Sequence, residues 1–380
     1  VPSAKERIER LARLKRVIVK YQEQFAEAIN RDYGNRAIAE TQIGEVLTCL
    51  EHIKYYSKNL TDWMKPSKRQ VGIIHQPAKA WAQYQPLGVI GIIAPWNYPL
   101  LLSLGPLICA LAAGNHAMIK ISSASAHFGK VLENAMSEAF PQELVAVING
   151  GGIISDAFCH LPFDKIIFTG STQVGKTVMA AASQNLVPVI LELGGKSPVL
   201  VHPSSDMVDV AQRIAVGKLW NAGQTCVAPD YMFLPKGKTA EFMEHFEQFV
   251  TEMYPHIRDN QDYTSIINDK QYRRLQGYLE DARERGANII EINPQSENVA
   301  ATRKMAPTVL TNVSPDMQIM QNEIFGPVLP ILEYEQIDDV IEFINSRPRP
   351  LALYYFDFDQ ARADYVAQRT HSGHFGQNTV

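Results

Sequence analysis

The chain has 380 residues, a formal net charge of −4 and a hydrophobic share of 46%. This length exceeds what one hydrophobic core usually holds, so we expect two domains in a soluble globular protein. Without a basic excess, the chain is not expected to bind nucleic acid. Its four cysteines lie far apart without a CxxC pair, which argues against a metal site and favours a reducing, cytoplasmic compartment.

The longest apolar stretches, near 89–93 and 99–113, are too short and too often broken by proline to cross a membrane. No signal peptide is evident, because the chain opens on a charged amphipathic segment. The chain begins inside a helix lead-in and ends in an apolar run at Val380. We therefore expect both ends to be incomplete and a C-terminal tail to be missing.

Two amphipathic helices are predicted first, over 4–31 and 36–60, because apolar residues recur there at helical spacing. Cys49 lies on the apolar face of the second helix and is expected in the core. The following segment, Pro66 to Gln85, is typical of two short strands joined by a turn near Pro77–Lys79. Two alternatives stay open for this hairpin: an arm that docks on another subunit, or a hairpin lying on its own domain.

From Gly88 onward, short runs rich in Val and Ile alternate with helical segments, which predicts a parallel sheet covered by helices on both faces. Ligands of such sheets bind where the strands end, beside glycine-rich turns. The strands are predicted at 88–94, 117–121, 144–148 and 165–169, and the helices near 99–113, 125–139 and 153–160.

The most informative stretch joins an apolar run, Val187 to Leu191, to the carboxylate of Glu192 and a turn at Gly194-Gly195. Cys226 follows 34 positions later, in a polar loop opened by glycine. A thiol and a carboxylate of this kind suit covalent catalysis followed by water activation. We expect Glu192 to be partly desolvated at its strand end, which would raise its pKa toward that of a useful base. The alternative is a structural carboxylate that caps a helix.

After Pro198 the alternation of strands and helices repeats, which predicts a second α/β domain. A hinge at Gly194-Gly195 would then place Glu192 and Cys226 on opposite walls of a cleft. The strands are predicted at 199–201, 230–234, 287–291, 307–313, 328–333 and 351–357, and the helices at 206–220, 238–253, 268–285, 336–345 and 359–369.

Residues Gly170 to Thr177 match the phosphate-loop pattern G-x-x-x-x-G-K-[ST], between a predicted strand and a predicted helix. One interpretation is a nucleotide hydrolase, although such a loop usually follows the first strand of its fold. The other interpretation places Gly170 and Ser171 against the diphosphate of a dinucleotide at a helix N-terminus.

Taken together, these segments resemble the aldehyde dehydrogenase superfamily, and most closely its short-armed dimeric class-3-like branch. The matching pieces are 94–99 (APWNYP), 168–175 (FTGSTQVG), 191–198 (LELGGKSP), 223–226 (GQTC) and 323–327 (EIFGP). Within that branch, residues 65–69, 76–81 and 226–231 are similar to bacterial coniferyl aldehyde dehydrogenases.

The resemblance implies an α/β fold with a Rossmann-like NAD(P)-binding domain (1–66 and 88–193), a β-hairpin oligomerisation arm (67–87) and a second, catalytic α/β domain (194–380). It also implies a homodimer that oxidises an aldehyde to the acid, with coniferyl aldehyde or a related aromatic aldehyde as the candidate substrate.

Cys226 is implied as the nucleophile that forms a thiohemiacetal and then a thioester. Cys109 and Cys159, on apolar helical faces, are interpreted as inert core thiols. The Asn97 amide and the Cys226 backbone N–H would stabilise the oxyanion, and Glu192 would activate the hydrolytic water. From the residues alone, Asn97 also fits an ordinary turn. A catalytically silent relative is a further alternative.

The cofactor residues implied by the resemblance are the ribose ligands and the groove around the diphosphate. Glu323 and Phe325 would contact the nicotinamide ribose, and Lys120 the adenosine ribose. The groove would be lined by Ile93, Pro95, Trp96, Gly170, Ser171 and Gly175. Where the family often reads Lys-Pro-Ser-Glu, this chain has Ser123 in place of the glutamate. A glutamate there would repel a 2′-phosphate, so we expect NAD as the main cofactor with NADP tolerated.

Overall fold

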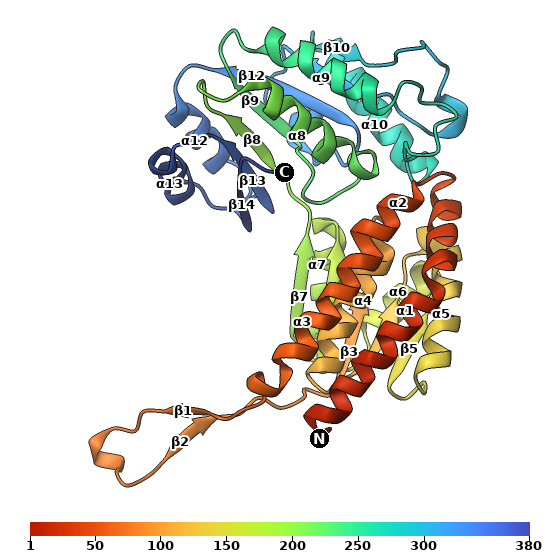
Figure 1. Ribbon diagram of the computed structural model, residues 1–380, viewed down its shortest axis with the longest axis vertical. Helices are drawn as coiled ribbons and strands as arrows, with labels where there is room; N and C mark the ends of the chain where they lie inside the picture. The colour runs from red at the N-terminus through yellow and green to blue at the C-terminus, as the bar shows by residue number, and fades with distance from the viewer. The chain divides into compact units, whose positions relative to one another are not determined.

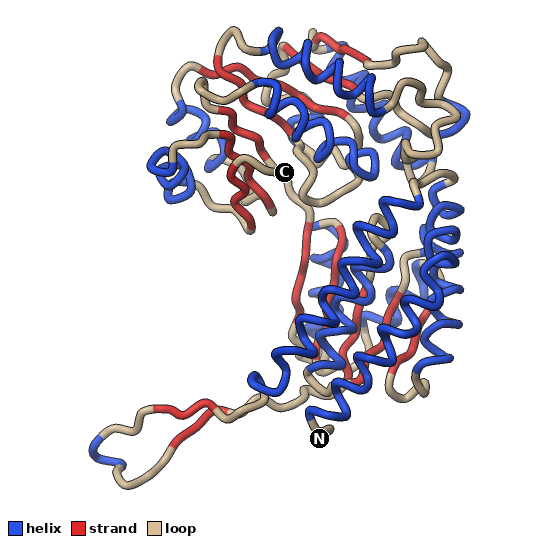
Figure 2. The backbone as a smooth tube through the Cα atoms, viewed as in Figure 1, coloured by secondary structure: helices blue, strands red, loops and turns tan.

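The computed structural model describes residues 1–380, which divide into two compact units. Unit 1 comprises Val1–Asp32 and Ile38–Glu192, and unit 2 comprises Tyr33–Ala37 and Leu193–Val380. Each unit is built on its own β-sheet with helices packed against it (Figures 1 and 2). The predicted α/β fold class is confirmed. No helix of the chain is both long and apolar enough to span a membrane.

The sheet of unit 1 has five strands in the order β5-β4-β3-β6-β7. Its central strand β3 pairs in parallel with β4 on one side and with β6 on the other, so that Ile92 lies between Ile119 and Ile167. The chain winds outward from β3 to β5 and then returns to β6, which makes β3 and β6 the point where the strand order reverses. The bounds are β3 Val89–Ile93, β4 His116–Lys120, β5 Val145–Ile148, β6 Lys165–Gly170 and β7 Val189–Leu193.

The helices of unit 1 follow the predicted apolar periodicity, and Leu11, Leu14, Ile18 and Phe25 on the first helix are fully buried. The helix predicted over 36–60 is wrong in its middle, where a π-helix interrupts it. The wider π turn lets Glu45 and Val46 face inward together with Cys49, which is buried as predicted. The bounds are α1 Ala4–Tyr33, α2 Ile38–Thr41, the π-helix Gln42–Leu47, α3 Thr48–Trp63, α4 Pro99–Ala112, α5 Ala126–Ala139, α6 Gly152–Cys159 and α7 Thr172–Ser183, with 3-10 turns at Ile73–His75 and Ser123–Ser125.

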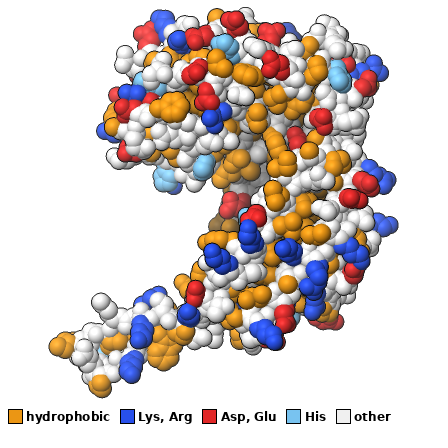
Figure 3. All heavy atoms as spheres, viewed as in Figure 1, with side chains coloured by type: hydrophobic (Ala, Val, Ile, Leu, Met, Phe, Trp, Pro, Cys, Tyr) orange, Lys and Arg blue, Asp and Glu red, His pale blue; other side chains and the backbone are white.

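The predicted hairpin is present as β1 (Ser67–Arg69) and β2 (Ala80–Ala82), which pair antiparallel with Lys68 opposite Trp81. Its connection is longer than the predicted turn, since residues 70–79 include a 3-10 turn. Almost every side chain of the hairpin is exposed, and Figures 1 and 3 show it projecting from the rest of unit 1. The alternative of a hairpin lying on its own domain is therefore wrong.

The sheet of unit 2 has seven strands in the order β10-β11-β12-β9-β8-β13-β14. All pairs are parallel except β10 with β11. The edge strand β14, which pairs with β13, was not predicted. The bounds are β8 Pro198–Val201, β9 Tyr231–Pro235, β10 Asn288–Glu291, β11 Thr308–Thr311, β12 Val328–Tyr334, β13 Ala352–Phe356 and β14 His374–Gln377.

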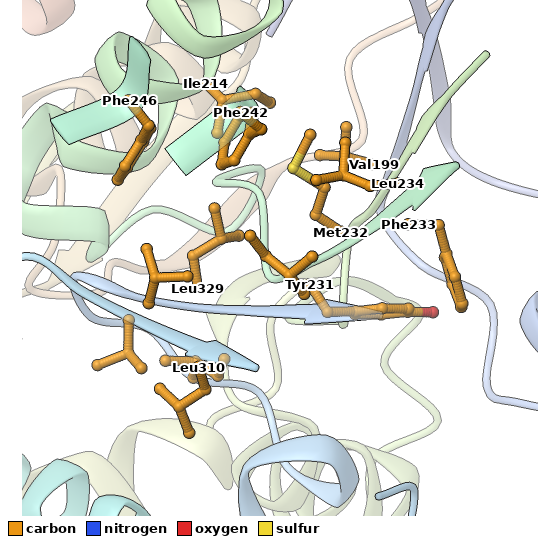
Figure 4. Close-up of a cluster of buried hydrophobic side chains, with 14 of the residues drawn as sticks. Val199, Ile214, Tyr231, Met232, Phe233, Leu234, Phe242, Phe246, Leu310 and Leu329 are labelled. Carbon is orange, nitrogen blue, oxygen red and sulfur yellow. The ribbon is translucent and has the colours of Figure 1, made fainter. Parts of the chain in front are cut away.

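The core of unit 2 lies between this sheet and its helices, where Figure 4 shows strand residues such as Met232 and Leu329 beside Ile214, Phe242 and Phe246. All of these side chains are buried, so the sheet that carries the following loops is firmly packed. The helices are α8 Met207–Leu219, α9 Thr239–Met253, α10 Asp269–Glu284, α11 Gln318–Gln321, α12 Ile337–Asn345 and α13 Gln360–Arg369, with 3-10 turns at Trp220–Gly223 and Ala300–Thr302.

Candidate functional site

The loop that carries Cys226 begins with strained backbone directly after α8. Asn221 and Ala222 have φ angles of 53° and 49°, and Gly223 continues the left-handed run with φ 71°. A residue with a Cβ in this conformation costs about 1–2 kcal/mol, and such strain gathers at functional sites. Two adjacent strained residues just before a cysteine therefore mark this loop as a candidate site.

A buried amide clamps the strained loop in place. Gln224 has no exposed surface, and its Nε2 donates to the carbonyl oxygens of Asn221 (3.0 Å) and Ser265 (3.1 Å). Its Oε1 accepts from the backbone N–H of Ile267 at 3.0 Å. Gln224 thus ties the backbone before the cysteine to a distant segment of unit 2, and its side chain is fully hydrogen-bonded.

The backbone after the cysteine is held as well, because the Tyr354 hydroxyl donates to the carbonyl oxygen of Val227 at 2.5 Å. Burial, and then the neighbouring Cys226, raises the pKa of Tyr354 to about 12, so this hydroxyl keeps its proton at neutral pH. Cys226 itself is partly exposed. Cys226 therefore lies, partly exposed, on a loop whose backbone is fixed at both sides.

The second part of the site in unit 2 is the carboxyl group of Glu323, which packs against the glycine turn after β7. The backbone N–H of Gly195 donates to Oε1 at 3.2 Å. A Cβ on Gly194 would lie 2.1 Å from Oε2, so a larger residue there would displace the Glu323 carboxyl group from this position. Burial, and then the nearby Asp230, raises the pKa of Glu323 to about 7.

An ion pair fixes the segment around Glu323 from one side. Lys196 donates to the Asp230 carboxylate, whose other oxygen accepts from the backbone N–H of Ile324 at 2.9 Å. Asp230 is buried, so this pair lies largely out of water, where its geometry is well fixed. Lys196 also donates to the carbonyl oxygens of Ile319 and Asn322, each at 2.8 Å.

Arg274 holds the same segment from α10. Its guanidinium donates to the carbonyl oxygens of Glu323 (3.1 Å) and Ile324 (2.7 Å). Sequence reasoning missed Arg274, Asp230 and Lys196 as supports of the site. For Asp230 a signal existed, since a carboxylate four residues after the cysteine and directly before an apolar strand is out of place in an ordinary core.

The Cys226 loop and the Glu323 segment touch at two glycines. A Cβ on Gly223 would lie 2.3 Å from the carbonyl oxygen of Gly326, so the two backbones are in direct contact. The structure therefore brings together the loop that carries Cys226 and the segment that carries Glu323 and Phe325, which lie about 100 positions apart in the sequence.

In unit 1, the other predicted residues gather at the carboxyl edge of the sheet where the strand order reverses. Ile93 ends β3 and is followed by half-buried Pro95 and Trp96 and by buried Asn97. Gly170 ends the neighbouring strand β6, and the exposed Ser171 begins α7. The Ser171 hydroxyl accepts from the Val174 N–H at 3.4 Å, and the buried Gly175 donates its N–H to the Ser171 carbonyl oxygen at 2.9 Å.

Lys120 ends the next strand along, β4, and Ser123 follows shortly after it. The Lys120 ammonium is buried and donates to the carbonyl oxygens of Ile121 (2.6 Å) and Gly150 (2.8 Å). Burial lowers the pKa of Lys120. Ser123 is exposed at the start of a 3-10 turn. Lys120 thus supports the turns at the strand ends, whereas Ser123 is accessible to a ligand.

Glu192 lies near the end of β7, and its predicted desolvation is wrong, because the side chain is exposed. The apolar run before it is only partly buried, and Ile190 is also exposed. β7 is an edge strand, and successive side chains along it point to opposite faces of the sheet, with Ile190 and Glu192 on the same, exposed face. In this structure Glu192 is a carboxylate in contact with solvent.

The interpretation of Cys109 as a core thiol is also wrong, whereas Cys159 is buried as predicted. Cys109 is exposed on α4, and a hydrogen bond of 3.0 Å joins its Sγ to the Tyr56 Oη on α3. The helical periodicity placed Cys109 among apolar residues, and its neighbours Ile108 and Ala110 are buried, but Cys109 itself lies on the exposed side of the helix.

Comparison with known proteins gives a consistent result over the whole chain. The family model described as "Aldehyde dehydrogenase family" matches residues 2–380. A "Probable coniferyl aldehyde dehydrogenase" of Pseudomonas aeruginosa is 48% identical over 373 residues, which cover 98% of this chain and 78% of that protein.

Solved structures agree with the sequence relatives. The substrate-bound state of Staphylococcus aureus AldH aligns with a TM-score of 0.93 at 37% identity, covering all of this chain and 81% of its own. The Mycobacterium tuberculosis aldehyde dehydrogenase complexed with NAD+ aligns with a TM-score of 0.89 at 25% identity, covering all of this chain and 78% of its own.

Proposed function

Since the chain belongs to the aldehyde dehydrogenase family, we propose that it oxidises an aldehyde to the carboxylic acid through a thioester on Cys226. The family match includes residues 170–177, so this phosphate-loop-like segment is part of a dehydrogenase and not of a nucleotide hydrolase. The observation that carries the proposal is the Cys226 loop, in which a partly exposed cysteine follows a strained backbone that Gln224 holds by hydrogen bonds.

The residues present fit a nicotinamide dinucleotide. The turn at Gly170-Ser171 opens α7 at the point of strand-order reversal, where a diphosphate can accept from backbone N–H groups. Glu323 offers a fixed carboxylate to ribose hydroxyls, with Phe325 beside it, and the turns after β3 and β4 supply the remaining contacts. NAD(P), when bound, supplies the hydride acceptor for the oxidation. We propose that unit 1 binds the cofactor and that unit 2 carries the nucleophile.

Cys226 acts first, as a thiolate that attacks the aldehyde carbon and converts the carbonyl oxygen into an oxyanion. The Asn97 amide and the Cys226 backbone N–H donate to that oxyanion. The clamped Cys226 loop and the buried position of Asn97 support this role, since donors that are already fixed need no reorganisation during the reaction. Loss of one such donor typically costs about 3 kcal/mol of barrier.

Glu192 acts last, as the base that takes a proton from the water that hydrolyses the thioester on Cys226. Its exposure on the edge strand gives water access to the carboxylate. Release of the free acid regenerates the Cys226 thiol. A silent relative would not need this set of residues, and retention of Cys226, Glu192, Asn97 and Glu323 favours an active enzyme.

We propose NAD as the main cofactor, with NADP tolerated, because exposed Ser123 stands where a glutamate would repel a 2′-phosphate. The Ser123→Glu variant should lower kcat/KM with NADP by at least about tenfold while leaving kcat/KM with NAD nearly unchanged. Steady-state kinetics with both cofactors measures this. Complete inactivity of the parent enzyme with NADP would refute the proposed tolerance.

The proposed substrate is an aromatic aldehyde of the coniferyl type, a proposal supported by the similarity to the Pseudomonas aeruginosa protein. NADH formation should be measured with coniferyl aldehyde, other phenylpropenoid aldehydes and aliphatic aldehydes of increasing length. We expect the highest kcat/KM with a phenylpropenoid aldehyde and no turnover with Cys226→Ala, because the thioester cannot form. NADH formation by Cys226→Ala at the parent rate would exclude the thiol mechanism, and a preference for aliphatic aldehydes would exclude only the substrate.

The proposed setting of this activity is a homodimer in a reducing, cytoplasmic compartment. All four cysteines are free, which suits such a compartment. The exposed hairpin of β1 and β2 is the proposed dimer arm.

A further inference from the structure

The helix that follows Asn97 has no cap of its own. Helix α4 begins at Pro99, and Tyr98 at its N-cap position makes no side-chain hydrogen bond to the first turn. Pro99 has no N–H to satisfy, and the Leu102 N–H already donates to the Tyr98 carbonyl oxygen at 2.9 Å. The N–H groups of Leu100 and Leu101 therefore need an acceptor from elsewhere, as helix starts require.

That acceptor is Glu45, which lies more than 50 positions earlier in the chain. Its Oε2 accepts from the N–H of Leu100 at 2.8 Å and from the N–H of Leu101 at 3.0 Å. The Glu45 side chain has no exposed surface. A carboxylate at the positive end of a helix dipole is stabilised, and the two charge-assisted bonds fix where the helix begins.

The π-helix explains how Glu45 reaches this position. The segment Gln42–Leu47 packs against α4, and its wide turn directs Glu45 and Val46 inward. Such an interruption in an α-helix is rare and is frequently found at functional sites. Here the interruption delivers a single carboxylate to the helix start that directly follows Asn97.

We propose that Glu45 is a positioning residue for the reaction: by capping α4, it fixes the direction of the chain at Tyr98 and Pro99, and so the place of the Asn97 amide. This inference rests on the proposed function, in which Asn97 donates to the oxyanion. The proposed role of Glu45 is thus indirect. It acts through the two backbone N–H groups and the short segment that joins them to Asn97.

The test compares Glu45→Ala, Glu45→Gln, Asn97→Ala and the double variant Glu45→Ala/Asn97→Ala. The readout is the rate constant of NADH formation in the first turnover, together with the KM for NAD. We expect Asn97→Ala to slow this step by about 10²–10³-fold and Glu45→Ala by about 10–100-fold, the effect of misplacing a catalytic group. The KM for NAD should not change.

Two results separate positioning from general damage. Glu45→Gln should recover the parent rate to within about threefold, because one Oε atom accepts both bonds and the glutamine carbonyl can replace it. The double variant should be no slower than Asn97→Ala alone, within about twofold, since the two residues act on one interaction. A double variant slowed by the product of both single effects would overturn the proposal.

Asp32 offers a matched control in the same unit. Helix α5 also lacks its own cap, and the largely buried Asp32 carboxylate accepts from the N–H groups of His127 (2.9 Å) and Phe128 (3.0 Å). Asp32→Ala removes the same kind of remote cap from a helix that does not follow Asn97. It should lower the melting temperature about as much as Glu45→Ala while changing the first-turnover rate by no more than about twofold.

The outcomes distinguish the inference from the function on which it rests. If Asn97→Ala keeps the parent rate, the proposed oxyanion role fails whatever Glu45 does. If Asn97→Ala is slow but Glu45→Ala is as fast as the parent, or if Asp32→Ala is slowed as much as Glu45→Ala, the positioning role of Glu45 is wrong and the proposed function stands.

Discussion

At the residue scale, Glu323 has the protonation behaviour with the clearest consequence. Burial, and then the nearby Asp230, raises the pKa of Glu323 from 4.5 to about 7, while the Gly195 N–H donates to its carboxyl group. The protein therefore holds a proton on roughly half of its Glu323 side chains at neutral pH. An ionised carboxylate accepts hydrogen bonds from hydroxyl groups more strongly than a neutral acid does. Binding of a ribose to Glu323 should favour the ionised form.

The affinity for NAD should therefore fall as the pH is lowered through 7, and binding should release a proton. Between pH 8 and pH 6 the dissociation constant for NAD should rise by up to about tenfold. Glu323 is about nine-tenths ionised one pH unit above its pKa and about nine-tenths protonated one pH unit below it. Titration calorimetry in buffers of different ionisation enthalpy measures both the affinity and the proton release. Glu323→Gln, which cannot ionise, should bind NAD more weakly than the parent at pH 8 and release no proton near pH 7. An equal proton release by Glu323→Gln would mean that another group is responsible.

At the scale of elements, the site of unit 2 depends on two loops pressed together at Gly223. Two separate features require glycine at this position. Its φ is 71°, and a Cβ would lie 2.3 Å from the Gly326 carbonyl oxygen. Gly237, in the turn before α9, has a similar φ of 79° but no atom near the place of a Cβ. Substitutions at the two glycines therefore distinguish two effects. Both positions would suffer backbone strain, but only a substitution at Gly223 would also cause a collision between the loops.

Gly237→Ala should destabilise the protein by about 1 kcal/mol, the cost of the left-handed conformation, and should keep full activity. Gly223→Ala should cost a further 1–3 kcal/mol or so through overpacking, and should lose activity because it displaces Cys226 from Glu323. Melting temperature and NADH formation measure the two effects. If the two variants are equally stable and equally active, the close contact between Gly223 and Gly326 is not required by the site.

These elements also show what the sequence could and could not predict. Apolar runs and their spacing predicted nearly every helix and strand, because that pattern reflects burial within one element. The clamp of Gln224 was not predicted, since its partners at Ser265 and Ile267 are more than 40 positions away. The exposure of Glu192 was missed because an apolar run does not reveal whether its strand is central or at an edge. Strand β14 was missed because it is only four residues long, contains one large apolar residue, Phe375, and is ordered by pairing with β13.

At the scale of the whole molecule, the hairpin of β1 and β2 is the feature that points beyond a single chain. A two-stranded ribbon is at best marginally stable alone, and this one exposes Ile73 (84%), Ile74 (89%) and Trp81 (61%). Exposed apolar side chains gathered on one projection favour a protein partner, and the proposed homodimer supplies one. Figure 3 shows Lys and Arg side chains beside the apolar ones on the hairpin.

Replacing the two isoleucines by charged residues should therefore disrupt the proposed dimer. We expect Ile73→Asp/Ile74→Asp to shift the mass in solution, measured by light scattering after gel filtration, from two chains to one, since burying two carboxylates without partners is costly. Ile153→Asp/Leu186→Asp is the matched control, because these residues are as exposed (87% and 89%) but lie outside the hairpin. This control should remain a dimer. A hairpin variant with the mass of two chains, or a parent protein with the mass of one, would assign the hairpin some other role.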